Sequence, residues 1–158
     1  MDSASLAEIR KELKQLPREE LLELIDHLAK YKRENKEYLN YLLFDSVDED
    51  AYANRIKQDV AEAFSATNTS GFYLAKKSIR RALRIANKYI KYSKKKETEL
   101  DVLIFFCEEM NSLDLNWKRS RVLVNLYERQ IQKVKKLYSD LHEDLQFDFQ
   151  ERVEGLTR

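Results

Sequence analysis

The sequence predicts an all-α protein, and three observations support that prediction. Its 158 residues include only two glycines and one proline, whereas β-hairpins depend on such residues at their turns. Apolar residues recur every three or four positions along most of the chain, as on one face of a helix. The charged fraction is 36%, above the usual ~25%, which is typical of helices with solvated outer faces. We therefore expect six to seven helices packed as antiparallel hairpins, and the short links between them leave superhelical curvature open.

The first third of the chain contains several helix-start signals. Ser5 and Glu8 have the spacing of a capping box, which predicts a helix from there to about residue 15. Pro17 is suited to the start of a second helix, because proline is tolerated in a first turn. The chain continues helical over residues 35–44, and whether a break precedes this stretch remains open. Asp48 is a candidate N-cap for a helix over residues 49–64.

Residues 72–96 form the central feature of the sequence, a helix with one apolar side and one cationic side. The stretch contains ten basic residues and no acidic residue. At 100° per residue, the apolar side chains fall on one face. That face contains Phe72, Ala75, Ile79, Ala82, Leu83, Ala86 and Ile90. The opposite face contains the candidate site for an anion or a charged partner, formed by Lys77, Arg80, Arg81, Arg84, Lys88 and Lys91.

The second half of the chain predicts a buried helix followed by a long amphipathic one. Residues 97–112 are apolar around most of a helical circumference, which is typical of a central helix, and we expect it to run antiparallel to the basic helix. A heptad-like seam then spans residues 124–141. The seam fits either packing within the chain or a homodimer contact. Residues 142–156 predict a final amphipathic helix.

Length and segment composition predict one helical domain over residues 1–158. Residues 65–71 are small and polar and end in Gly71, so they are a candidate hinge. The N-terminus lacks a cationic segment followed by an apolar one, and no apolar run approaches ~20 residues. We therefore expect a soluble, cytoplasmic protein with no membrane partner.

The search for catalytic chemistry in the sequence is negative. His27 and His142 lack the spacing of zinc or di-iron helix motifs. Two glycines cannot build a phosphate-binding loop. Cys107 is the only cysteine, and its apolar neighbours indicate a core residue and not a nucleophile. The sequence therefore predicts no enzyme activity, no catalytic residue, no metal and no cofactor, although a site assembled only by folding lies outside its reach.

The charge distribution is uneven although the net charge is only +1. Residues 1–50 carry 8 bases and 13 acids, residues 51–100 carry 12 and 4, and residues 101–158 carry 9 and 11. The positive charge of this face is therefore either compensated by acids of the same chain or available to a partner. If Glu97, Asp101 or the tail covers it, the face is structural.

Two functions follow for an open cationic face. The first is a non-enzymatic binding or scaffold protein that interacts with another protein through charged helix faces. The alternative is binding to a nucleic-acid phosphate backbone, with Tyr73 and Tyr92 beside the basic residues. The pI near 7.7 favours the first, because dedicated nucleic-acid domains usually exceed pI 9.

The order of segments also resembles a small uncharacterised bacterial family, one of the domains of unknown function. The resemblance is carried by residues 13–21, 35–39, 75–82, 90–93 and 99–101. It covers most of the chain and implies an all-helical bacterial protein. It implies no activity, cofactor or site residue.

Overall fold

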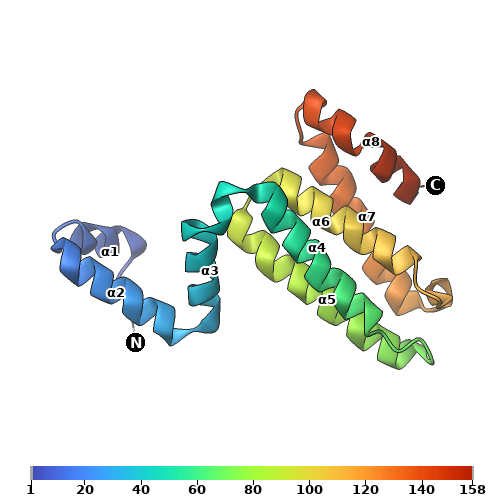
Figure 1. Cartoon of the computed structure of the whole chain (residues 1–158), viewed down its shortest axis with the longest axis horizontal. Helices are drawn as coiled ribbons and strands as arrows, with labels where there is room; N and C mark the ends of the chain where they lie inside the picture. The colour runs from blue at the N-terminus through green and yellow to red at the C-terminus, as the bar shows by residue number, and fades with distance from the viewer. Residues whose placement is uncertain (1, 158) are drawn as a thin grey trace. The chain divides into compact units, whose positions relative to one another are not determined.

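The computed structural model describes residues 2–157 and divides the chain into two compact units, Met1–Phe44 and Asp45–Arg158 (Figure 1). The described residues contain helices and no strand, as the sequence predicts. They form eight α-helices and two short 3-10 turns, so the expected number of six to seven was too low. The extra helix arises because Lys32 adopts an extended backbone (φ −141°, ψ 144°) between two helices.

The first unit contains α1 (Leu6–Leu13), α2 (Arg18–Tyr31) and α3 (Arg33–Leu43). The predicted capping box is present at the start of α1. The Ser5 hydroxyl accepts a hydrogen bond from the Glu8 amide at 3.3 Å, and the Glu8 carboxylate accepts one from the Ser5 amide at 2.7 Å. At the break between α2 and α3, the Asn35 side chain donates to the Leu28 carbonyl at 2.7 Å. This bond satisfies one of the carbonyls that a helix end leaves unpaired.

The second unit is built around α6. Its elements are η1 (Asp45–Val47), α4 (Glu49–Ser65), α5 (Phe72–Ser93), α6 (Lys96–Asn111), η2 (Trp117–Arg119), α7 (Arg121–Ser139) and α8 (Glu143–Thr157). The central helix packs against α4, α5, α7 and α8 (Figure 1). Its residues Leu100, Leu103 and Phe106 are fully buried. The Phe106 ring lies 5.3 Å from that of Phe64 on α4, within the range of favourable aromatic pairs.

Most of the apolar face predicted for the basic helix is the buried face of α5, but Phe72 is 41% exposed and Leu83 is only partly buried. Ala75, Ile79, Ala82 and Ala86 have no exposed surface. The small alanine side chains permit close packing against neighbouring helices, since the distance between helix axes depends on the side chains at the contact. The helix ends at Ser93, and the next residue, Lys94, has a left-handed backbone (φ 57°) typical of a helix C-terminus. Because the alanine face is buried, the opposite face of α5 points toward solvent.

Two predicted segments have defined places in the second unit. The candidate hinge, residues 65–71, includes the loop that joins α4 to α5, and these two helices pack together. In the 124–141 seam, Ile131, Val134 and Leu141 are buried within the unit, where α7 packs on α6 and α8. Packing inside the chain therefore buries part of this seam, whereas Val124, Tyr127 and Tyr138 are only partly buried. Among residues 2–157, no helix has both the length and the apolar character needed to cross a membrane.

Candidate functional site

All six predicted site residues lie on α5, outside its buried face. The structure nevertheless places them in different surroundings. Lys77 and Arg80 line a groove between α5 and α7, whereas Arg81 and Lys88 line one between α4 and α5. Arg84 lines both grooves, and Lys91 lines neither of them. The cationic face is therefore two surfaces and not one.

The α5–α7 groove has a volume of about 700 Å³, within the ~300–1,000 Å³ of typical ligand sites. Its lining contains five basic residues and no acidic residue. The remaining side chains are three apolar ones, three amides and one tyrosine. The full lining is Tyr73, Lys76, Lys77, Arg80, Leu83, Arg84, Asn87, Val122, Asn125, Leu126, Arg129 and Gln130.

The basic side chains of the α5–α7 groove form no ion pair with a carboxylate of the described residues. Within residues 2–157, Lys77, Arg80, Arg84 and Arg129 form no ion pair. Lys76 lies 5.8 Å from the centre of the Tyr73 ring, a cation–π distance, and forms no ion pair with a residue that the structure describes. Because like charges in a groove raise its positive potential, this surface favours an anion.

The α4–α5 groove differs, because α4 supplies acids to it. Its volume is about 650 Å³, and Asp59 and Glu62 face the same space as Arg81 and Lys88. Burial raises the pKa of Asp59 and the nearby Glu62 charge raises it further, while Lys88 and Arg55 act in the opposite direction. The positive charges of this groove are therefore partly compensated by acids of the same chain. This was one of the two interpretations of the cationic face.

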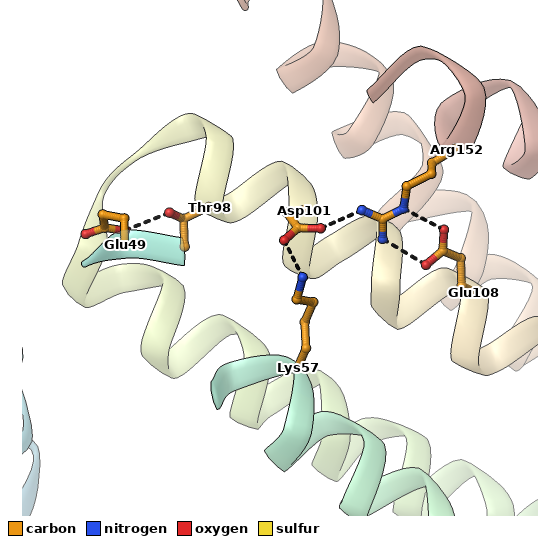
Figure 2. Close-up of polar contacts among 6 residues, drawn as sticks. All are labelled: Glu49, Lys57, Thr98, Asp101, Glu108 and Arg152. Carbon is orange, nitrogen blue, oxygen red and sulfur yellow. Dashed lines mark hydrogen bonds and ion pairs between the residues drawn. The ribbon is translucent and has the colours of Figure 1, made fainter. Parts of the chain in front are cut away.

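Two acids of α6, Asp101 and Glu108, are engaged away from the α5–α7 groove. Arg152 on α8 donates two hydrogen bonds to Glu108, at 2.9 and 2.8 Å, and one to Asp101 at 2.6 Å (Figure 2). Asp101 also accepts a hydrogen bond from Lys57 on α4 at 2.6 Å. The hydrogen bond to Glu108 is the largest cause that raises the pKa of Arg152. Asp101 therefore joins α4, α6 and α8 and does not cover the groove.

A second polar contact holds the turn that follows α5. One Glu49 oxygen accepts a hydrogen bond from the Thr98 hydroxyl at 2.7 Å (Figure 2). The same oxygen accepts one from the Ser93 hydroxyl at 2.9 Å. Glu49 begins α4, so the carboxylate ties the start of α4 to the α5–α6 turn. This contact fixes the far end of α5 and contributes no charge to either groove.

Other sites for chemistry are not assembled in the described part of the chain. Residues 2–157 contain no cluster of three or more histidine, cysteine or acidic side chains suited to a metal. Cys107 has no exposed surface, and burial raises the pKa of its thiol to about 12. A nucleophilic cysteine requires the opposite environment, one that lowers its pKa.

The buried thiol gives a direct prediction. We expect Cys107 to be inert toward dithionitrobenzoate in the folded protein, because the reagent requires an accessible thiolate. One thiol per chain should react in concentrated urea. Absorbance of the released thiolate measures both reactions. Rapid modification of the native protein, at the rate of a free thiol, would contradict the burial of Cys107.

Comparison of the chain with known protein families, with curated proteins and with solved structures found no match. The fold and the α5–α7 groove thus remain the basis for a functional argument. They describe an all-helical protein with a groove between two helices, whose lining contains five basic residues and no acidic residue.

Several residues of the α5–α7 groove could not be assigned to it from the sequence. The cationic half of the groove follows from the period of α5, but Val122, Asn125 and Leu126 belong to a different helix. Arg129 lies near Lys133, Lys135 and Lys136 in the sequence, and the spacing of these basic residues does not indicate a contact with α5. The available signal was the helical spacing of residues 122, 126 and 129, which places them on one edge of α7.

Proposed function

We propose that this protein is a non-enzymatic helical binding protein whose α5–α7 groove takes an acidic, amphipathic helix of a protein partner. The observation that carries this proposal is the groove lining, which combines five basic residues, three apolar residues and no acid. The groove therefore offers a ligand both positive charge and apolar contact on one surface. A ligand that is acidic but not amphipathic would use only the positive charge.

The shape of the site supports a helix as the ligand. Two helices border the groove, and a third helix packs naturally between the ridges of two others. An apolar stripe on the partner would contact Leu83, Val122 and Leu126, of which Val122 is 44% exposed. Glutamate or aspartate beside that stripe would then reach Arg80 on α5 and Arg129 on α7. This arrangement buries apolar surface and pairs charge at the rim.

Binding to a nucleic acid is the second candidate, and the exposed cations of α5 favour it. Phosphates need clustered lysine and arginine, which the groove provides. Single-strand binding also uses aromatic side chains as stacking platforms, and the groove lining contains one aromatic residue, Tyr73. A phosphate backbone would leave Leu83, Val122 and Leu126 without an apolar partner. The protein ligand therefore fits more of the lining.

A comparison of two labelled ligands tests the proposal. One is a synthetic peptide of about 14 residues, roughly four helical turns, with leucine on one face and glutamate elsewhere. The other is a single-stranded oligonucleotide of similar charge. Fluorescence anisotropy should show tighter binding of the peptide, and an otherwise equal peptide with alanine on the apolar face should bind more weakly. Preference for the oligonucleotide, with a steep dependence on salt, would favour the second candidate.

A further inference from the structure

Three of the five basic residues that line the α5–α7 groove lie within about one helical turn of α5. Lys76 and Lys77 precede Arg80 by four and three residues, so both are its neighbours on the helix surface. None of the three lines the α4–α5 groove, where the acids of α4 lie. Like charges at this spacing destabilise a helix. An anion bound to this basic cluster, Lys76, Lys77 and Arg80, would relieve that repulsion.

The basic cluster lies near the end of the groove at which both of its helices begin. The lining starts with Tyr73, the second residue of α5, and with Val122, the second residue of α7. The two helices run in the same general direction from this end (Figure 1). Neither has an acidic residue in its first turn, and neither N-cap residue, Gly71 or Ser120, forms a side-chain capping hydrogen bond. The positive ends of two helix dipoles therefore add to the positive potential at this end of the groove.

One carboxylate does not match the charge of the basic cluster. A helix that lies in the groove presents about one side chain per turn along a given line, whereas the basic cluster has three charges in a similar length of α5. A carboxylate brings one negative charge and two acceptor oxygens. A phosphoryl group brings about −1.5 to −2 charges near pH 7 and three strong acceptor oxygens. The phosphoryl group therefore fits this end of the groove better than a glutamate or an aspartate.

The types of donor in the lining also suit a phosphoryl group. The Arg80 guanidinium can donate two parallel hydrogen bonds to phosphate oxygens, and a lysine ammonium binds phosphate as a point charge. Tyr73 is 75% exposed and Asn125 on α7 is also exposed, so a hydroxyl and an amide in the same lining are available as neutral donors. The lining has no carboxylate that would repel the anion.

We propose that the partner helix carries a phosphorylated serine or threonine, whose phosphoryl group binds to the basic cluster. This inference rests on the proposed function, because it requires that the α5–α7 groove takes a helix. The apolar stripe of the partner contacts Leu83 and Leu126, and the phosphoryl group lies at the end of the groove where α5 and α7 begin. Phosphorylation of the partner then regulates its affinity for this protein.

Three peptides that differ at one position test the proposal on the full-length protein. Each has the acidic amphipathic sequence described above, with serine, glutamate or phosphoserine in its first helical turn. Fluorescence anisotropy at about pH 7.5 should show that the phosphoserine peptide binds about tenfold more tightly than the glutamate peptide, since it forms additional charge-assisted hydrogen bonds. The serine peptide should bind most weakly. Circular dichroism of the free peptides checks that their helix contents are similar.

The charge of the phosphoryl group gives the test a second measurement. Its second pKa is ~6, so it loses about one negative charge at pH 5.5, and the advantage over glutamate should then shrink. The ionisable residues that line the groove are lysines, arginines and Tyr73, which keep their charge states between these pH values. Asp59 and Glu62 on α4 line the other groove. Any effect of their titration would appear equally with the glutamate peptide.

Two matched variants locate the phosphoryl group. Lys76→Gln/Lys77→Gln should abolish most of the advantage of phosphoserine over glutamate, while Arg80 still binds the acidic helix. Lys91→Gln/Lys135→Gln removes two exposed lysines outside the groove and should retain the advantage.

Three results would overturn the phosphoryl site and leave the proposed function standing. They are equal affinity for the phosphoserine and glutamate peptides, an advantage unchanged at about pH 5.5, and an advantage that survives in Lys76→Gln/Lys77→Gln. Failure of all three peptides to bind would overturn the proposed function as well. Tighter binding of a single-stranded oligonucleotide of equal charge would replace both with nucleic-acid binding.

Discussion

Reversing the charge of Lys77 and Arg80 is expected to weaken binding of the acidic helical peptide by about 100-fold, which corresponds to ~2.7 kcal/mol. Both side chains line the α5–α7 groove and the α4–α5 groove has neither of them. Each replacement by glutamate removes an attraction and introduces a repulsion with the ligand. Because these side chains form no ion pair within residues 2–157, the change should alter folding stability by less than ~0.5 kcal/mol. Anisotropy titrations and urea denaturation measure the two effects separately.

The matched control for this variant reverses Lys91 and Lys135. Lys91 lies on α5 and Lys135 on α7, both are exposed, and neither lines the α5–α7 groove. The control changes the net charge by the same amount, so it reports attraction that depends only on overall charge. We expect it to weaken binding by less than about tenfold, with the residual effect lost at high salt. Equal losses in the two double variants would mean that the groove does not place the ligand.

Replacing Arg152 by methionine is expected to destabilise the second unit by about 2 kcal/mol, within the range for hydrogen bonds to charged groups. Methionine retains much of the arginine stem but removes the three hydrogen bonds to Glu108 and Asp101. The carboxylates are then left partly buried without this partner. Urea denaturation followed by the fluorescence of Trp117, the only tryptophan and 5% exposed, measures the change.

A surface pair in the same unit is the control for Arg152→Met. Lys96 and Asp140 lie 3.3 Å apart, and their side chains are 54% and 42% exposed. Ion pairs of this kind contribute ~0–1 kcal/mol because water and salt screen them. Lys96→Met should therefore have a smaller effect than Arg152→Met, with an unchanged denaturant slope in both. A similar effect of the two variants would show that Arg152 is only another surface charge.

The helices were predictable where the sequence has a strong period. The buried face of α5 follows from Ala75, Ile79 and Ala82 at helical spacing, and the structure confirms it. The capping box of Ser5 and Glu8 was predictable because it is local and has a fixed spacing. The break at Lys32 was not, since it depends on backbone angles that several residues near it could adopt. That ambiguity accounts for the error in the number of helices.

The groove was only half predictable, because it is made by two helices far apart in sequence. Periodicity gives the cationic face of α5 but cannot show that Val122 and Leu126 lie across from Arg80. Periodicity also cannot show that Arg81 and Lys88 face acids of α4 and do not line the α5–α7 groove. The surroundings of each basic residue are set by the positions of the neighbouring helices.

The engaged carboxylates depend even more on the fold. Arg152 and Asp101 are 51 residues apart, and Lys57 and Asp101 are 44 apart. In the sequence Asp101 is a candidate to cover the basic face, since it follows the basic helix closely. Its pairing with Lys57 and Arg152 removes it from that role. The exposed leucines of α1 and α2 illustrate the same limit, because their period predicts an apolar face but not whether the chain buries it.

Nuclear magnetic resonance of the labelled protein tests the central claim most directly. Addition of the unlabelled acidic peptide should shift the backbone amides of both walls of the groove, Tyr73–Asn87 on α5 and Val122–Gln130 on α7. The shifts should be largest near Leu83 and Leu126, where the apolar lining meets the ligand, and small for Asp59 and Glu62 on α4. Shifts centred on the α4–α5 groove, or shifts confined to α5 with none on α7, would contradict binding in the α5–α7 groove.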